Sequence, residues 1–273
     1  MKRVTQVSLK HILSISLLAA IILLSSCKKT DEDQAINISK DVFTTADQKL
    51  IGQRIKEEIS HNQAAFTVLD EEVYPSFYNY INTLLQILVN TSGVEHREDF
   101  EWSVTVLEDD NLQTAFTAPG GQIFIYTGLL KLLSAENELM SIFAHEIAYA
   151  DKEYAVYKLK DEYGGNLLGD IILGKMDTGI DQVATGLKTL SFELDQVAMA
   201  DNYAVSLLCP FQYNAMGLKT IIEHPDHSSI QWLVTRPNYA NRTDIILEQA
   251  ASCGEEDPTY AERYAYFKSQ LPE

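Results

Sequence analysis

The chain has 273 residues, of which 46% are hydrophobic and 22% are charged, so it has the composition of a globular protein and can bury a sizeable core. Its 39 acidic and 21 basic side chains give a formal net charge of −18. Because a surface this acidic repels a phosphate backbone, we expect no nucleic acid partner.

The N-terminus has the order of features that is typical of a bacterial lipoprotein signal peptide. Basic residues come first, and an apolar run over residues 12–24 follows that is short for a membrane span. The run leads through two serines to Cys27, which resembles the lipobox in which a cysteine takes the lipid. We therefore predict a signal peptide over residues 1–26 and an extracytoplasmic lipoprotein, anchored at the cell envelope through Cys27. An ordinary signal peptide or an N-terminal anchor helix is the alternative.

The remaining 247 residues divide at about residue 40. Residues 27–40 are mostly polar and lack apolar periodicity, which indicates a flexible tether, and residues 41–273 are predicted to form the domain. Cys209 and Cys253 are the cysteines left in this domain. In an exported protein such a pair predicts a disulfide, with two unrelated reduced thiols as the alternative.

The domain is expected to be α+β, mainly helical with a small sheet. Apolar spacing predicts two early helices, alternation predicts a strand, and Pro119-Gly120-Gly121 predicts a turn before a second strand. Ser134 is expected to cap the next helix, which runs without a break to residue 159, and another long helix follows. The expected helices cover residues 46–59, 74–89, 134–159 and 182–208, and the strands residues 102–107 and 122–126.

The segment that should carry chemistry is His145-Glu146-Ile147-Ala148-Tyr149. A His-Glu-x-x-His helix places two imidazoles on one face to bind one zinc ion, and the Glu acts as general base on the metal-bound water. Here His145 and Glu146 are present, and Tyr149 stands where the second imidazole would be. Alone, this partial motif is weak.

The surrounding sequence adds three further runs at matching spacing. They are Thr114-Ala115-Phe116, Pro119-Gly120-Gly121 and Gly128-Leu129-Leu130. With residues 145–148, these runs resemble the HtpX and CAAX prenyl protease type of zinc metallopeptidases (metallopeptidase family 48), and most closely its lipid-anchored bacterial branch. The resemblance covers about residues 40–253 and implies a zincin-like metallopeptidase domain.

The resemblance also implies that the metal site is degenerate. In the family a second helix reads Glu-x-x-Ala-Asp with its Glu on zinc, and here Val197 takes the place of that ligand while Asp201 is retained. Asp201 would orient His145 by a hydrogen bond. A Thr-His-Pro run of the family corresponds to Thr235-Arg236-Pro237, so Arg236 adds positive charge near the place of the cation.

The resemblance further implies a substrate cleft. Gly120, Gly121 and Arg236 would lie in it, and the strand from Gly120 to Tyr126 would form its edge and pair with an extended peptide.

Other residues are candidates for replacing the lost ligands. Glu193 lies one helical turn before Val197, and His224 and His227 belong to a loop that would have to swing inward. For both histidines a solvated surface loop is the competing interpretation. Glu146 and Asp201 could in principle pair for metal-free acid chemistry, but the family role of Asp201 is the simpler interpretation.

Two functional hypotheses follow. The first is a catalytically degenerate homologue that binds zinc weakly or not at all, although the family implies zinc, and that acts as a peptide-binding or regulatory module in envelope protein quality control. Its partners would be extended or unfolded envelope proteins or a peptidase paralogue. The alternative is an active zinc metalloendopeptidase with an unorthodox ligand set around His145 and Glu146. A purely structural lipoprotein explains the sequence least well.

Overall fold

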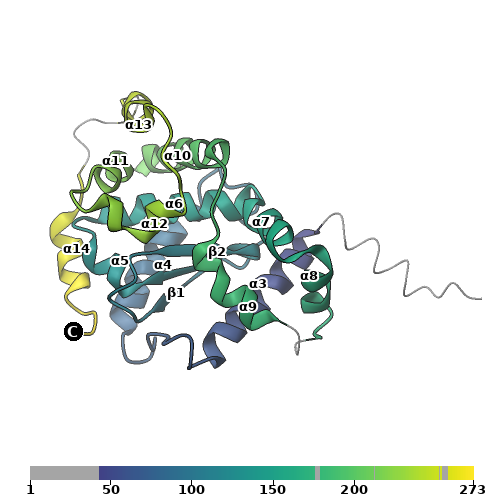
Figure 1. Ribbon diagram of the computed structural model, residues 1–273. Helices are drawn as coiled ribbons and strands as arrows, with labels where there is room; N and C mark the ends of the chain where they lie inside the picture. Colours follow the sequence, from purple (N-terminus) through teal and green to yellow (C-terminus); the bar gives the residue numbers. More distant parts are fainter. Residues whose placement is uncertain (1–42, 176–178, 212, 252, 254–257) are drawn as a thin grey trace, which may run out of the picture. The chain divides into compact units, whose positions relative to one another are not determined.

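The computed structural model describes residues 43–175, 179–211, 213–251, 253 and 258–273, all of which belong to the unit Val42–Glu273 (Figure 1). The predicted signal peptide, the lipid on Cys27 and the tether lie outside the described residues and stay predictions. None of the described helices is both long enough and apolar enough to cross a bilayer.

A three-stranded sheet lies at the centre of the unit (Figure 1). Its strands are β1 (Ser103–Leu107), β2 (Ala115–Ala118) and β3 (Gln122–Tyr126), in the order β1-β3-β2. β3 is parallel to β1 and antiparallel to β2. The strand over residues 122–126 is therefore central, and the expectation that it forms the edge of a cleft is wrong. A local pattern of strand-forming residues does not say which neighbours the strand will pair with.

Helices make up most of the remaining structure, so the α+β, mainly helical fold is confirmed. Their bounds are α3 (Thr45–His61), α4 (Pro75–Val89), α5 (Thr127–Leu132), α6 (Glu136–Asp151), α7 (Tyr154–Tyr163), α8 (Gly165–Ile172), α9 (Ile180–Gly186), α10 (Leu194–Leu208), α11 (Gly217–Ile222), α12 (Gln231–Val234), α13 (Arg242–Ala250) and α14 (Ala261–Lys268).

The two faces of the sheet are buried in different cores. Successive side chains of a strand point to opposite faces. Val104 and Val106 of β1 therefore join the core formed with α4, α6 and α10, whereas Leu107 joins the core formed with α3, α8 and α9. α10 covers α6, and α13 covers α10 in turn (Figure 1). Helix α6 is thus enclosed between the sheet and α10, which explains why all of its side chains are buried.

Two long helices expected from the sequence are each interrupted. The first ends at Asp151 and resumes at Tyr154, because Glu153 adopts a left-handed conformation with φ of 59°. Its N-cap is Ala135 instead of Ser134, whose backbone N–H donates to the Glu138 carboxylate at 2.8 Å.

The second break lies between α9 and α10. After the short 3-10 helix Leu187–Thr189, the chain runs extended to Glu193, the N-cap of α10. Phe192 of this stretch donates its N–H to the carbonyl of Thr235 at 3.1 Å. Residues 187–192 pack beside β2. They do not continue the helix that the sequence predicted over residues 182–208.

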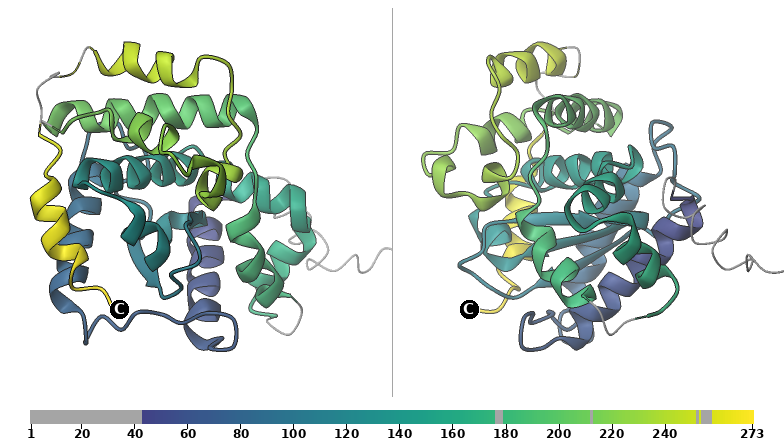
Figure 2. Two further views of the ribbon diagram at one scale, coloured as in Figure 1. Left: turned by 60° about the vertical axis from the view of Figure 1, so that its left-hand side comes forward. Right: turned by 45° about the vertical axis from the view of Figure 1, so that its right-hand side comes forward.

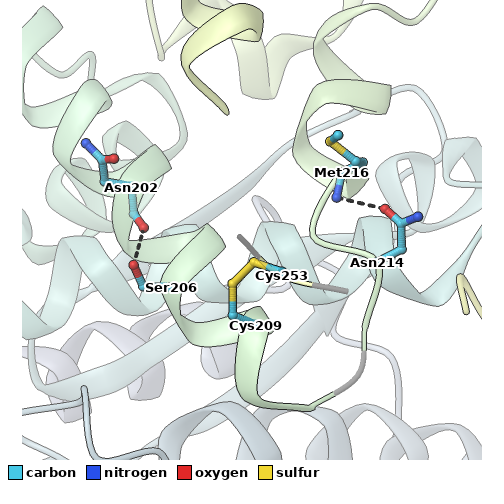
Figure 3. The surroundings of a disulfide bond; sticks show 6 residues. All are labelled: Asn202, Ser206, Cys209, Asn214, Met216 and Cys253. Atoms are coloured by element: carbon cyan, nitrogen blue, oxygen red, sulfur yellow. Dashed lines mark hydrogen bonds between the residues drawn. A yellow bond between two sulfur atoms is a disulfide. The ribbon is translucent and has the colours of Figure 1, made fainter. Parts of the chain in front are cut away.

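Cys209 and Cys253 connect the end of α10 to the segment that follows α13 (Figure 3). Their Cα atoms are 5.1 Å apart and their sulfur atoms are bonded. This spacing lies within the range that a disulfide allows without backbone movement. The link therefore holds the outer helix α13 to the layer formed by α10.

Candidate functional site

The residues singled out by the family motif meet in the interior of the unit. His145, Glu146 and Tyr149 come from α6, Val197 and Asp201 from the facing helix α10, and all five side chains are at most 1% exposed. The chain that follows α12 adds Arg236 and Arg242, which are each 2% exposed. A charged group at this depth is stable only if it is paired.

Arg236 forms a buried ion pair with the carboxylate of Glu146. Its other terminal nitrogen donates to the Trp232 carbonyl at 3.1 Å and to the Thr235 hydroxyl at 2.8 Å. The guanidinium also lies over three aromatic rings, 4.6 Å from the centroid of Trp232, 5.3 Å from that of Tyr149 and 6.0 Å from that of Phe192. The indole N–H of Trp232 donates to the same Glu146 oxygen at 2.8 Å. The motif carboxylate is thus neutralised by an internal cation.

A second charged cluster surrounds Asp201. His145 Nε2 lies 3.0 Å from Asp201 Oδ1, Arg242 donates to both carboxylate oxygens at 2.8 and 2.9 Å, and the Tyr239 hydroxyl donates at 3.0 Å. Burial acts to raise the pKa of Asp201, but the hydrogen bonds from His145 and Arg242 outweigh it and hold the pKa below its usual range. Burial lowers the pKa of His145, which favours the neutral imidazole.

The two positions at which the resemblance predicts lost ligands, Tyr149 and Val197, are filled by packing. Tyr149 stacks on Phe192, with ring centroids 3.8 Å apart and ring planes 8° apart. Burial raises the pKa of its phenol far above the ordinary value, so Tyr149 does not supply a phenolate. Val197 belongs to the same apolar cluster as Tyr149, Phe192, Ala148 and Ala200.

The candidate replacement ligands lie elsewhere. The side chain of Glu193 is 75% exposed and its carboxylate is 3.8 Å from Lys158 Nζ. His224 is half-buried and His227 is exposed, and His227 Nδ1 contacts the His224 carbonyl at 3.0 Å within their own loop. Among the residues that the structure describes, no three His, Cys, Asp or Glu side chains converge in a way that could hold a metal ion.

The donor set therefore does not fit zinc. Catalytic zinc sites use three protein ligands and an open position. Here His145 already contacts Asp201 through Nε2, and Glu146 Oε1 is held by Arg236 and Trp232. Buried polar atoms without a partner in the described chain do remain, namely His145 Nδ1, Glu146 Oε2, Tyr149 OH and Arg236 Nε. A dication placed among them would be repelled by the neighbouring guanidinium.

The expected cleft residues separate into two places. Gly120 has a φ of 74° and packs so closely on α3 that a Cβ would approach the Lys49 Cα to 2.7 Å, while Gly121 packs against the Trp102 ring. Both glycines shape the turn between β2 and β3. Arg236 instead faces β2, where a terminal nitrogen lies 3.5 Å from the Ala115 carbonyl.

The edge of β2 is covered by the chain itself. Leu187, Leu190 and Phe192 lie beside Phe116 and Thr117, and the cavity left between them measures about 10 Å³. This leaves no room for an extended peptide along β2.

Comparisons with known proteins agree with the motif. The family described as Peptidase family M48 matches residues 77–250, which is most of the described unit. The chain belongs to peptidase family M48. The M48 match contains α6 with His145 and Glu146, α10 with Asp201, and Arg236. The zincin-like metallopeptidase fold expected from the resemblance is therefore confirmed.

Two curated relatives are metalloendopeptidases of mitochondria. "Mitochondrial metalloendopeptidase OMA1" of Schizosaccharomyces pombe is 27% identical over 92 residues, which is 33% of this chain and 26% of that protein. "Metalloendopeptidase OMA1, mitochondrial" of Bos taurus is 33% identical over 75 residues, which is 28% of this chain and 14% of that protein. The match spans about a quarter or less of these relatives.

Arg236 was expected from the sequence near the place of the family's metal ion, but the residues that hold the site together were not. Trp232 supplies a ring and a hydrogen bond to Glu146, and Phe192 supplies the stacking partner of Tyr149. The spacing of four residues between Trp232 and Arg236, one helical turn, is the sequence feature that could have predicted their contact. Nothing in the sequence points to Phe192, because its position depends on the break between α9 and α10.

Proposed function

We propose that this M48 chain is a catalytically degenerate relative of the zinc metalloendopeptidases, acting as a protein-binding or regulatory module at the bacterial cell envelope. The observation that carries the proposal is the buried pair of Arg236 and Glu146. A general base needs a free carboxylate beside an activated water. Glu146 Oε1 is already bound by a guanidinium and an indole, so the base of the family reaction is engaged in the protein interior.

The alternative, proteolysis with unorthodox ligands, has no support from the geometry. Tyr149 is packed against Phe192, Glu193 faces solvent, and His224 and His227 remain in their surface loop. Tyr149 is part of the apolar cluster around Val197, so recruiting it as a ligand would disturb that cluster.

Extended or unfolded envelope proteins, or a peptidase paralogue, are the proposed partners. The β2 edge is covered, and the outer edge of β1 is already paired at Leu107 with Val68 in an antiparallel bridge, so the part of the sheet left for strand addition is the beginning of β1 around Val104. The N–H of Val106 donates outward to the Tyr78 hydroxyl at 3.2 Å, and its carbonyl accepts from Leu69 at 2.9 Å. The direction of the backbone N–H and C=O groups alternates along a strand, so those of Val104 point to the same side as those of Val106. On that side lies a cavity of about 630 Å³, which Val104 and Lys56 line.

The envelope location is supported by the predicted signal peptide over residues 1–26, which precedes Cys27, and by the Cys209–Cys253 pair, since disulfides persist in oxidising compartments. It is tested by radiolabelled palmitate incorporation with Cys27→Ser as control. Label that persists in the variant would contradict lipidation at Cys27.

Metal content and proteolysis test the loss of catalysis directly. The purified mature chain is analysed for bound metal after incubation with zinc, and casein cleavage is followed with and without a chelator. We expect far less than one zinc per chain and no chelator-sensitive cleavage. Stoichiometric zinc together with cleavage that a chelator stops and Glu146→Gln abolishes would overturn the proposal.

Strand addition at β1 is tested separately. Val104→Pro removes the outward N–H, whereas Val104→Ala loses side-chain packing but keeps that donor. We expect the full chain to suppress aggregation of reduced, unfolded lysozyme, and the proline variant to suppress it less than the alanine variant. Equal suppression by the two variants would exclude β1 as the binding edge.

A further inference from the structure

Helix α4 is unusual in this acidic protein because its 15 residues include no charged side chain. α14 packs beside it (Figure 2), and the 3-10 helix Cys209–Phe211 lies at the same groove. Two adjoining cavities of about 590 and 470 Å³ run along the outer face of α4. They share four lining residues, Asn79, Thr83, Ile87 and Phe211, and so form one groove, which we call the α4 groove.

Aromatic rings form the inner part of the α4 groove. Tyr80 and Phe267 stack with centroids 4.0 Å apart and ring planes 7° apart. Phe211 stands at the junction of the two cavities, and Tyr260 lines the inner one, with the Arg263 guanidinium 4.0 Å above its ring. Phe211, Tyr260 and Phe267 are only partly buried, so they offer ring surface to a ligand.

Among the described residues, Arg263 is the charged side chain that lines the groove, and Glu136 beneath it already neutralises its charge. Glu136 is completely buried and forms an ion pair with Arg263, whose Nε donates to it at 2.6 Å. The hydroxyls of Tyr80 and Tyr213 donate to the same carboxylate at 2.8 and 2.6 Å. Among the residues that the structure describes, no carboxylate lines either cavity. An anionic ligand would have to compete with the buried Glu136 for Arg263, and a cationic ligand would find no carboxylate among the described lining residues.

The outer part of the groove is a row of side-chain amides. Asn79, Asn82, Gln86 and Asn90 are spaced by three, four and four residues, so they form a stripe about 16 Å long on α4. These amides make no hydrogen bond with the part of the chain that the structure describes. Each amide presents both a donor and an acceptor to solvent.

We infer that the α4 groove binds a neutral oligosaccharide. Sugar rings present C–H faces that pack on aromatic rings, and each hydroxyl donates and accepts, which matches an amide. A peptide that binds by strand addition would need a strand edge, and the groove is built from helices. An amphipathic helix would need an apolar stripe, whereas the exposed stripe of α4 is polar. A proline-rich peptide uses aromatic ridges with few donors and leaves most of the amide row unused. This inference does not depend on the metal centre or on β1.

The test is calorimetric titration of the full mature chain with cellohexaose, chitohexaose and maltohexaose. We expect saturable binding of at least one of them. Asn82→Asp combined with Gln86→Glu keeps the shapes but replaces two donors by carboxylates, and should weaken binding about tenfold or more. The matched control is Asn202→Asp on the exposed face of α10 (Figure 3), which should bind as the unmodified chain does.

Phe211→Ala provides a second variant that removes the ring at the junction, with the urea unfolding midpoint as a check on folding. A folded Phe211→Ala chain should also lose binding. Failure of all three sugars to bind at 10 mM, or binding that both groove variants retain, would overturn the inference. A proline-rich decapeptide that binds the groove and is displaced by none of the sugars would overturn it as well.

Discussion

Removing the guanidinium of Arg236 should expose how much the interior depends on it. Arg236→Met keeps a long apolar stem but leaves the carboxylate of Glu146 buried, with the indole N–H of Trp232 as its remaining donor within the described chain. Breaking a buried ion pair by removing one partner costs about 3–5 kcal/mol, because the other charge stays uncompensated. The contacts to the Trp232 carbonyl and the Thr235 hydroxyl are lost too, which places the expected cost toward the upper end.

The companion variant separates the ion pair from the packing. In Arg236→Met combined with Glu146→Leu both charges are gone, and such replacements are often neutral or stabilising. We expect the double variant to recover most of the loss, with a coupling energy of about 2 kcal/mol or more in the double-mutant cycle. Lys219→Met breaks the partly exposed pair with Glu223 and should change stability by about 1 kcal/mol or less.

Urea unfolding followed by tryptophan fluorescence measures these differences, since Trp232 touches the altered group and is completely buried. A loss of about 1 kcal/mol or less for Arg236→Met would refute the reasoning, because it would mean that water or a counter-ion reaches Glu146. A double variant no more stable than Arg236→Met would show that the guanidinium acts through packing instead of charge.

Three further predictions concern the scaffold, and urea unfolding measures each. Gly52→Ala should cost about 3 kcal/mol, because a Cβ there overlaps a backbone carbonyl oxygen. Gly93→Ala meets side-chain atoms only, the nearest being a methyl at 3.4 Å, and should be tolerated; equal costs would contradict this packing. Replacing Cys209 and Cys253 by serine opens a loop of 44 residues and should cost about 4 kcal/mol, and an unchanged midpoint would show that the bond does not form. Burial raises the pKa of Glu138, so folding takes up a proton between the unfolded pKa of about 4.3 and the folded one, and stability falls as pH rises through that window. Glu138→Gln should remove this fall, and an unchanged pH profile would contradict it.

The sequence predicted those elements whose periodicity is local. The helices expected over residues 46–59 and 74–89 correspond to α3 and α4, and the strand over residues 122–126 has the bounds of β3. The pairing of the strands and the breaks in the long helices could not be predicted in this way. β3 is central because it pairs with both β1 and β2, and no local pattern contains those contacts. The break before α10 depends on a stretch that packs against β2, so tertiary contacts override a helical pattern there.

In the candidate site, too, features with a local sequence pattern could be predicted, and features that depend on tertiary contacts could not. The His145-Glu146 motif and the substitutions at Tyr149 and Val197 could be read from residue types at fixed spacing. That Arg236 would pair with Glu146 could not, because the two lie 90 residues apart and meet only through the packing of α12 against α6.

The three residues that depart from the family pattern at the centre, Tyr149, Val197 and Arg236, contact the same cluster, which predicts how a zinc site could be created. Restoring Tyr149→His alone leaves the Arg236 guanidinium beside any incoming zinc, and Val197→Glu alone adds a buried carboxylate next to an apolar cluster. Arg236→His alone leaves Glu146 without its counter-ion. Each single change should therefore lower stability and bind no zinc. The triple variant supplies two imidazoles and a carboxylate at the family positions and removes the competing cation, so it should bind one zinc per chain, measured by elemental analysis and by a chelator-reversible rise in melting temperature. If Tyr149→His with Val197→Glu binds zinc equally well while Arg236 remains, the guanidinium does not exclude the metal, and the explanation of this centre by charge replacement is wrong.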